Sequence, residues 1–246
     1  MTRKSRKNSG ILKSQPNEGR SPLSLNRYDM FPHMENCLTT TYREWFLYHN
    51  VMHRHYTHYL GYKVLKSPFD WIVMQDVIFD TKPEVIIEIG SWEGGMALWM
   101  AHYLENMGSD AQVICVDQAD RSKVPGGQKA LHPRIHWVHG EATDPATVAK
   151  VAELVGDKRG MVIEDSEHKY HITKQLLELY YKFVAPDCYF LVEDTWVEFL
   201  QVPPFPGPLN AVKEFAAAHT EDFVIDRTRE KYIITYNPMG YLLRLK

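Results

Sequence analysis

The chain has 246 residues, of which 44% are hydrophobic and 12% aromatic. This length and composition fit one sizeable α/β domain with a full hydrophobic core, and they exclude a chain that is disordered overall. The formal net charge of −3 at pH 7 excludes a global electrostatic attraction to nucleic acid or to an anionic membrane.

Residues 1–27 are rich in Lys, Arg, Ser, Asn and Pro, so we expect a flexible basic arm there. They lack the apolar segment of a secretory signal, and no stretch approaches the roughly 18 apolar residues of a membrane span. Cys37, Cys115 and Cys188 are an odd number without metal-type spacing, which favours free thiols in a reducing compartment. We therefore expect a soluble protein of the cytoplasm.

Residues 28–67 are expected to form a helical and aromatic cap. Within them, the stretch from Thr41 to Tyr62 places Trp45, Val51 and Tyr59 at helical spacing, which predicts a helix over 41–62.

Residues 68–246 alternate apolar runs of strand length with amphipathic stretches, a pattern typical of βαβ units with a parallel sheet. The predicted strands are 85–89, 112–116, 135–138, 161–165 and 189–193, and the predicted helices are 95–106, 144–155, 169–184 and 209–219. Two β-rich runs near the end, FVIDR and YIITYNPMGYLLRL, have no helix between them and predict an antiparallel closing pair. The fold class is therefore α/β, with a mostly parallel sheet of seven strands.

The first predicted strand ends in a glycine loop, VIIEIGSWEGG, which contains Gly90 and Gly94. Glycines at a strand-to-helix turn let backbone N–H groups approach an anionic ligand, although tight turns also need glycine for steric reasons alone. The spacing is not G-x-G-x-x-G, which disfavours NAD. Asp117 lies 22 residues after Gly95 (117 − 95 = 22), where an acid can bind ribose hydroxyls, so we expect an adenosine-bearing cofactor.

Acidic residues follow the fourth and fifth predicted strands, with Asp165 in the motif EDSEH and Glu193-Asp194 in LVEDT. In the usual order of an open sheet these strands are neighbours, so their carboxylates converge at one edge and predict a Mg²⁺ site. His168 then lies over the same site as a candidate general base. The alternative is that these acids cap helices and that His168 is an ordinary surface residue.

These motifs resemble the cephalosporin hydroxylase / rhamnosyl O-methyltransferase family, S-adenosylmethionine-dependent enzymes that include macrolide sugar O-methyltransferases. The matching stretches are KSPFD, KPEVIIEIGSWEGG, EATDP, EDSEH, LVEDT, GPLNAVKEF and DRTREKYIITYNPMGYL. The resemblance covers roughly residues 60–246 and implies a Rossmann-like methyltransferase. Where the family usually has Gly-Asp-Ser-Thr after the third strand, this chain has Gly140-Glu141-Ala142-Thr143.

The resemblance implies a role for each matching residue. The implied metal ligands are Asp165, Glu193 and Asp194, the implied base is His168, and the expected cofactor contacts are Glu88, Gly90, Ser91, Gly94, Asp117 and Glu141.

The expected function is Mg²⁺-dependent methylation of a hydroxyl on a small natural product or its sugar, by an enzyme that forms a homo-oligomer and binds neither nucleic acid nor membrane. Substrate selection is expected in the cap and in the loop QVPPFPGP at 201–208. Two alternatives remain open. An oxidative enzyme would need an iron site, for which HRHYTH at 53–58 is the one histidine-dense candidate. A non-catalytic subunit would use the same fold for assembly.

Overall fold

The structure is a computed structural model that describes residues 41–200 and 205–246. It divides the chain into two compact units, residues 1–45 and 46–246, and the account below concerns the second unit. The predicted arm at 1–27, residues 28–40 of the predicted cap, Cys37 and residues 201–204 of the proline-rich loop lie outside the described residues. The division into arm, cap and main domain stays a prediction.

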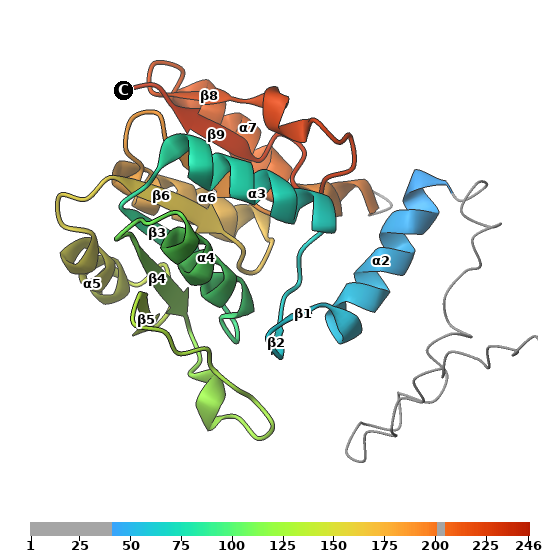
Figure 1. Cartoon of the computed structure of the whole chain (residues 1–246). Helices are drawn as coiled ribbons and strands as arrows, with labels where there is room; N and C mark the ends of the chain where they lie inside the picture. Colours follow the sequence, from blue (N-terminus) through green and yellow to red (C-terminus); the bar gives the residue numbers. More distant parts are fainter. Residues whose placement is uncertain (1–40, 201–204) are drawn as a thin grey trace, which may run out of the picture. The chain divides into compact units, whose positions relative to one another are not determined.

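Seven strands form one sheet in the order β5-β4-β3-β6-β7-β9-β8 (Figure 1). The strands are β3 (Val85–Ile89), β4 (Gln112–Asp117), β5 (Ile135–His139), β6 (Gly160–Glu164), β7 (Tyr189–Val192), β8 (Phe223–Ile225) and β9 (Tyr241–Arg244). The first five are parallel, whereas β9 is antiparallel to β7 and to β8. The predicted fold class is therefore confirmed, and the first five strands lie within one residue of their predicted positions.

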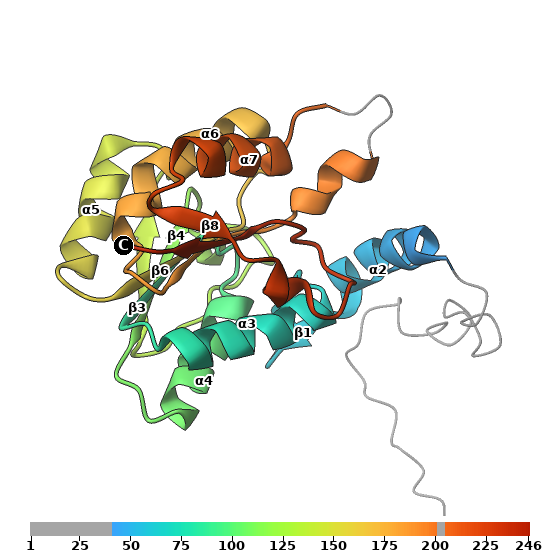
Figure 2. The same ribbon diagram turned by 90° about the horizontal axis from the view of Figure 1, so that it is seen from above.

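Helices cover both faces of this sheet (Figure 2). One face packs against α3 (Pro68–Thr81) and α4 (Gly95–Asn106), and the other packs against α5 (Pro145–Val155), α6 (Tyr170–Tyr180) and α7 (Pro208–Ala218). The parallel strands are buried on both sides, which explains their continuous apolar sequences. The helices α3, α5 and α7 begin with proline at the first helical position, where the missing N–H leaves no hydrogen bond unmade.

One prediction about the region before the sheet was wrong, and one helix there was not predicted. The helix predicted over 41–62 ends earlier, because α2 spans Tyr42–Tyr56 and a short hairpin follows, with β1 (His58–Tyr59) and β2 (Tyr62–Lys63). Its turn uses left-handed backbone at Leu60 and Gly61. Helix α3 was not predicted, because its sequence is apolar nearly all round, with Ile72 and Phe79 exposed, and shows no clear helical period.

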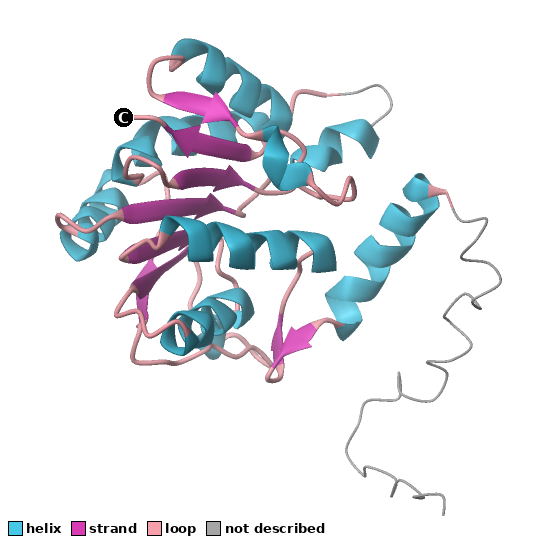
Figure 3. Ribbon diagram, turned by 45° about the horizontal axis from the view of Figure 1, so that its top comes forward, coloured by secondary structure: helices cyan, strands magenta, loops and turns pink. Residues whose placement is uncertain are grey.

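The second closing strand is much shorter than predicted. Only Tyr241–Arg244 of the run YIITYNPMGYLLRL is a strand, as Figure 3 shows, and residues 231–240 form turns. In these turns the backbone is left-handed at Ile233 and Met239, which ends extended structure. The remaining short elements are 3-10 turns: η2 (Arg121–Lys123), η3 (Tyr181–Phe183), η4 (Thr195–Leu200) and η5 (Arg227–Glu230).

In the described part of the chain, no helix is long and apolar enough to cross a membrane. Cys115 and Cys188 are buried free thiols, as predicted for them.

Asp70 fastens α3 to the segment before β9. Its side chain is 4% exposed, and it accepts hydrogen bonds from the Thr235 hydroxyl at 2.5 Å and from the Tyr236 backbone N–H at 2.7 Å. Burial raises the pKa of Asp70 to about 6, although both hydrogen bonds favour the charged form.

We expect Asp70→Ala to lower the free energy of unfolding by about 3 kcal/mol, because it removes a buried side chain that accepts two hydrogen bonds. The matched control is Asp80→Ala on the same helix, whose side chain is 51% exposed, and it should cost less than about 1 kcal/mol. Urea denaturation at pH 7 measures both. Equal losses would contradict a fastening role for Asp70.

The pKa of Asp70 also predicts a pH dependence. Because the folded value of about 6 exceeds the ordinary 3.8, the folded protein holds this proton more tightly than the unfolded chain between those values. The contribution of Asp70 to stability is therefore full below about pH 4 and falls as the pH rises toward 6. Asp70→Asn should flatten this part of the stability profile, which denaturation at several pH values measures.

Candidate active site

A cavity of about 360 Å³ lies at the carboxyl ends of β3, β4, β6 and β7, where the strand order brings their following loops together. A volume of this size suits a small-molecule ligand. Five of the six predicted cofactor residues line it, namely Glu88, Gly90, Ser91, Asp117 and Glu141. Three of the predicted metal and base residues also line it, namely Asp165, His168 and Asp194. Among the described residues, Gly94 and Glu193 are not part of the lining.

The glycine loop after β3 is shaped by close contact with the loop after β6. Gly90 has φ +90°, and a Cβ atom there would lie 2.0 Å from the carbonyl oxygen of Asp165. Only glycine therefore lets β3 and β6 end side by side at the cavity. Gly94 has φ +79°, and a Cβ atom there would lie 2.7 Å from the Trp137 ring. The structure thus gives a steric reason for Gly94, and its contact with a cofactor stays a prediction.

Asp117, at the end of β4, lines the cavity and accepts hydrogen bonds from two backbone N–H groups. Its Oδ2 accepts a hydrogen bond from the Trp92 backbone N–H at 2.8 Å, and its Oδ1 accepts one from the Ala119 N–H at 2.9 Å. Glu88 lies beside it on β3, where burial raises its pKa to about 7. The Oε2 atom of Glu88 is buried without a protein partner, so it is available to a ligand donor.

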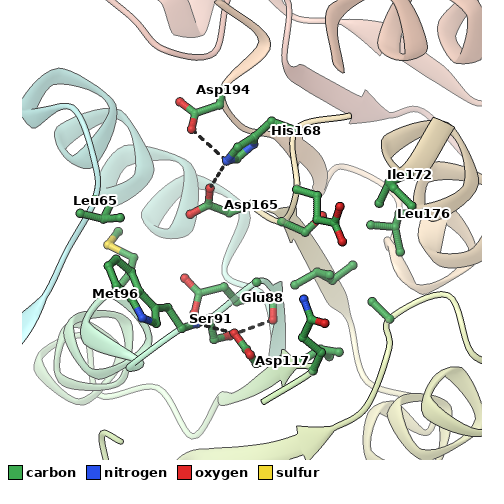
Figure 4. Close-up of a pocket in the computed structure, with 18 of the residues that line it drawn as sticks. Leu65, Glu88, Ser91, Met96, Asp117, Asp165, His168, Ile172, Leu176 and Asp194 are labelled. Carbon is green, nitrogen blue, oxygen red and sulfur yellow. Dashed lines mark hydrogen bonds and ion pairs between the residues drawn. The ribbon is translucent and has the colours of Figure 1, made fainter. Parts of the chain in front are cut away.

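Asp165, His168 and Asp194 form a tight group at one end of the cavity (Figure 4). The Nε2 atom of His168 lies 3.1 Å from Asp194 Oδ2 and 3.8 Å from Asp165 Oδ1. One ligand-type atom from each residue lies within 4.8 Å of the others. Desolvation raises the pKa of Asp194, whereas the nearby His168 opposes this effect. Asp165 and Asp194, which follow two separate strands, thus meet in space, whereas Glu193 is not part of this group.

Three cavity residues hold a left-handed backbone that side chains rarely adopt. The φ angles of Trp92, His168 and Asp194 are +48°, +53° and +54°. Such positions cost on the order of 1–3 kcal/mol each and persist where the surrounding structure enforces them, often at functional sites.

Lys66 and Trp196 donate hydrogen bonds to the carboxylates of this acidic group. Neither residue was predicted to have a role from the sequence. The Lys66 ammonium donates to Asp165 Oδ2 at 2.7 Å and to Glu193 Oε2. Glu193 is thereby turned toward Lys66, and its Oε1 is buried without a partner. The indole N–H of Trp196 donates to Asp194 Oδ1 at 2.8 Å and fixes this carboxylate. Lys66 occurs in the motif KSPFD, but no local pattern marks its side chain as buried.

A second cluster of potential ligands, His102, Glu105 and His132, lies away from the cavity. The Nδ1 atom of His132 accepts a hydrogen bond from the Arg134 backbone N–H at 3.2 Å. The proton of the neutral ring therefore lies on Nε2, which is 3.5 Å from Glu105 Oε1. A histidine that binds a metal through Nε2 normally donates a hydrogen bond from Nδ1, so the acceptor role of Nδ1 in His132 disfavours a metal at this cluster.

Comparisons with known proteins agree with the expected family. The sequence model of "Rhamnosyl O-methyltransferase/CmcI" matches residues 51–245. Rhamnosyl O-methyltransferase of Mycobacterium tuberculosis is 26% identical over 220 residues, which are 87% of this chain and 88% of the relative.

Two solved structures share the fold. A CmcI structure with Mg and SAM has a TM-score of 0.59 and 21% identity, and the match covers 77% of each chain. The MycE methyltransferase from the mycinamycin biosynthetic pathway, in complex with Mg, SAH and mycinamycin VI, has a TM-score of 0.53 and 17% identity over 71% of this chain and 48% of that one. Because the family's sequence model matches residues 51–245 of the 246-residue chain, the chain belongs to the rhamnosyl O-methyltransferase/CmcI family.

Proposed function

We propose that the protein is an S-adenosylmethionine-dependent and Mg²⁺-dependent O-methyltransferase that acts on a hydroxyl of a small natural product or its sugar. The observation that carries this proposal is the position of His168 between Asp165 and Asp194 at one end of a cavity that begins at the Gly90 loop. Family membership supports it, since relatives are named O-methyltransferases and one related structure contains Mg and SAM.

The residues around the Gly90 loop fit the cofactor. Glu88 has a buried carboxylate oxygen without a protein partner, which can accept from the amino group of the methionine part. Asp117, at the end of β4, has the position and charge to accept from ribose hydroxyls. Glu141 lines the cavity in the loop after β5, where we place it next to the adenosine part.

The acidic end of the cavity fits a hard divalent cation. Asp165 and Asp194 each have a carboxylate oxygen within 4.8 Å of the other and of a His168 nitrogen, and Glu193 keeps a buried oxygen without a partner. Hard oxygen donors suit Mg²⁺ better than zinc. We therefore assign Asp165, Asp194 and Glu193 as its ligands.

The chemistry divides between the bound groups and the protein. When bound, S-adenosylmethionine supplies the methyl group, and Mg²⁺ supplies positive charge that favours loss of the hydroxyl proton. In the neutral ring of His168, Nε2 holds the proton toward Asp194, and Nδ1 is buried without a partner. His168 accepts the hydroxyl proton at Nδ1, and Asp194 stabilises the imidazolium that results. The acceptor oxygen that has lost its proton would then be the nucleophile for the methyl group that bound S-adenosylmethionine would supply.

The rim of the cavity supplies surfaces for the acceptor. Trp92 and Trp196 line it, and flat apolar rings of this kind suit the faces of sugars and macrocycles. Trp196 also stacks on Phe46 of α2 with ring centroids 4.7 Å apart, which connects the cap to the cavity. Substrate selection by the cap and by the loop at 201–208, and assembly into a homo-oligomer, stay predictions.

The alternative functions have less support. For an oxidative enzyme, His58 of the predicted iron candidate is exposed, and the side chains of His53 and His55 lie outside the described part of the structure. In the cluster at His102 and His132, the acceptor role of His132 Nδ1 disfavours iron binding through Nε2. For a non-catalytic subunit, we would expect loss of the acidic group or of the cavity, and the described structure keeps both.

Removal of the metal is expected to abolish turnover. EDTA should stop methylation of an acceptor, and added Mg²⁺ should restore it. Asp194→Asn should weaken Mg²⁺ binding by about tenfold or more, since even residues behind the ligands cost about that much. The matched control is Asp157→Asn, whose residue is exposed in the turn after α5 and should bind normally. The metal role would be contradicted if the protein binds S-adenosylmethionine tightly and its turnover is unchanged by EDTA.

His168→Ala is expected to lower kcat by about 10²–10⁴-fold while leaving the affinity for S-adenosylmethionine nearly unchanged, because the substitution removes the proposed proton acceptor. Calorimetry measures the affinity, and a methyl-transfer assay measures kcat. The control is His171→Ala, an exposed histidine on α6 outside the cavity lining, which should keep wild-type turnover. Turnover that survives in His168→Ala would place the base elsewhere.

A further inference from the structure

The side chain of Lys66 lies inside the acidic group and is only 4% exposed. It comes from the segment between β2 and α3, whereas its partners Asp165 and Glu193 follow β6 and β7. One ammonium therefore connects the ends of two neighbouring strands. A fully buried lysine is rare in proteins unless it is paired, so this placement needs a reason.

Asp165 and Glu193 each use only one of their two carboxylate oxygens to bind Lys66. Lys66 takes Oδ2 of Asp165 and Oε2 of Glu193. The second oxygen of Asp165, Oδ1, faces His168 at 3.8 Å, and the second oxygen of Glu193, Oε1, is buried without a partner. Each of the two carboxylates thus keeps one oxygen that Lys66 does not bind.

The group keeps a net negative charge when its acids are ionised. Asp165, Glu193 and Asp194 then carry −3 and Lys66 contributes +1, which leaves −3 + 1 = −2, and Glu88 also interacts with Lys66. Without any cation, three crowded carboxylates repel one another and resist burial. With Lys66 alone, the repulsion is reduced but not removed.

We propose that Lys66 is a built-in counter-cation of the metal site. It holds Asp165 and Glu193 together when no divalent ion is bound, and its own charge weakens the binding of that ion. This inference rests on the proposed metal role. It implies that the protein stays folded without Mg²⁺ and that the site exchanges the ion more readily than three carboxylates alone would.

The test replaces Lys66 by the similarly shaped but uncharged methionine. In EDTA, Lys66→Met should melt about 10 °C below the wild type, because one partner of a buried ion pair has been removed. Titration with MgCl₂ in a calorimeter should show a Kd about tenfold or more below that of the wild type, because the repulsion between the ammonium and the ion is gone. Saturating Mg²⁺ should recover most of the lost melting temperature.

The control is Lys231→Met, whose lysine pairs with Asp76 and is 45% exposed. It should leave both the Mg²⁺ affinity and the metal-free melting temperature unchanged. A purely structural lysine would lower stability equally with and without Mg²⁺ and would not tighten binding. The inference is therefore overturned if the affinity of Lys66→Met for Mg²⁺ is equal to or lower than that of the wild type.

The outcome separates this inference from the proposed function. If the wild type does not bind Mg²⁺ at all, the metal role and the inference about Lys66 both fail. If the wild type binds Mg²⁺ but Lys66→Met does not bind it more tightly, only the inference about Lys66 fails. If Lys66→Met does not fold, Lys66→Met/Glu193→Gln removes one charge of each sign. That double variant should fold in EDTA, and its failure to fold would show that Lys66 is needed for packing rather than for charge.

Discussion

The repulsion among carboxylates at the ends of β3, β6 and β7 is the constraint on which the site depends. Parallel strands that are neighbours in the sheet end at one edge, so Glu88, Asp165 and the pair Glu193-Asp194 are brought together by the fold itself. Such a group can be buried only beside positive charge or hydrogen-bond donors. Lys66, the indole N–H of Trp196 and His168 supply part of this compensation within the protein.

The backbone around the cavity is also unusual, because the chain segments that carry these acids are packed closely together. Gly90 has no Cβ because the carbonyl of Asp165 occupies that place, and His168 and Asp194 hold left-handed conformations. Strain of this kind is stable only on a rigid support. Here the support is a sheet buried on both faces, and Asp70 fastens α3 to the segment that leads into β9.

In the proposed site, two kinds of cation would provide this compensation. The ammonium of Lys66 is always present, whereas the occupancy of a divalent ion depends on its concentration. We propose that sharing the carboxylates between them keeps the metal-free site folded and leaves oxygens free for the ion. His168 lies beside Asp165 and Asp194, so the proposed metal ligands and the proposed base are parts of one network.

The sequence by itself determined the sheet, the glycine loop and the acidic strand ends, because apolar runs, glycine spacing and charge at strand ends are local patterns. It did not reveal α3, which carries Ile72 and Phe79 on its exposed side and shows no clear helical period, or the turns at 231–240 within an apparently continuous β-rich run. Only the tertiary structure decided that Lys66 enters the acidic group, that Glu193 turns toward it and that Gly94 packs under Trp137. These facts arise from contacts between segments far apart in the chain, and no local pattern of residues records which distant side chain will fill a given space.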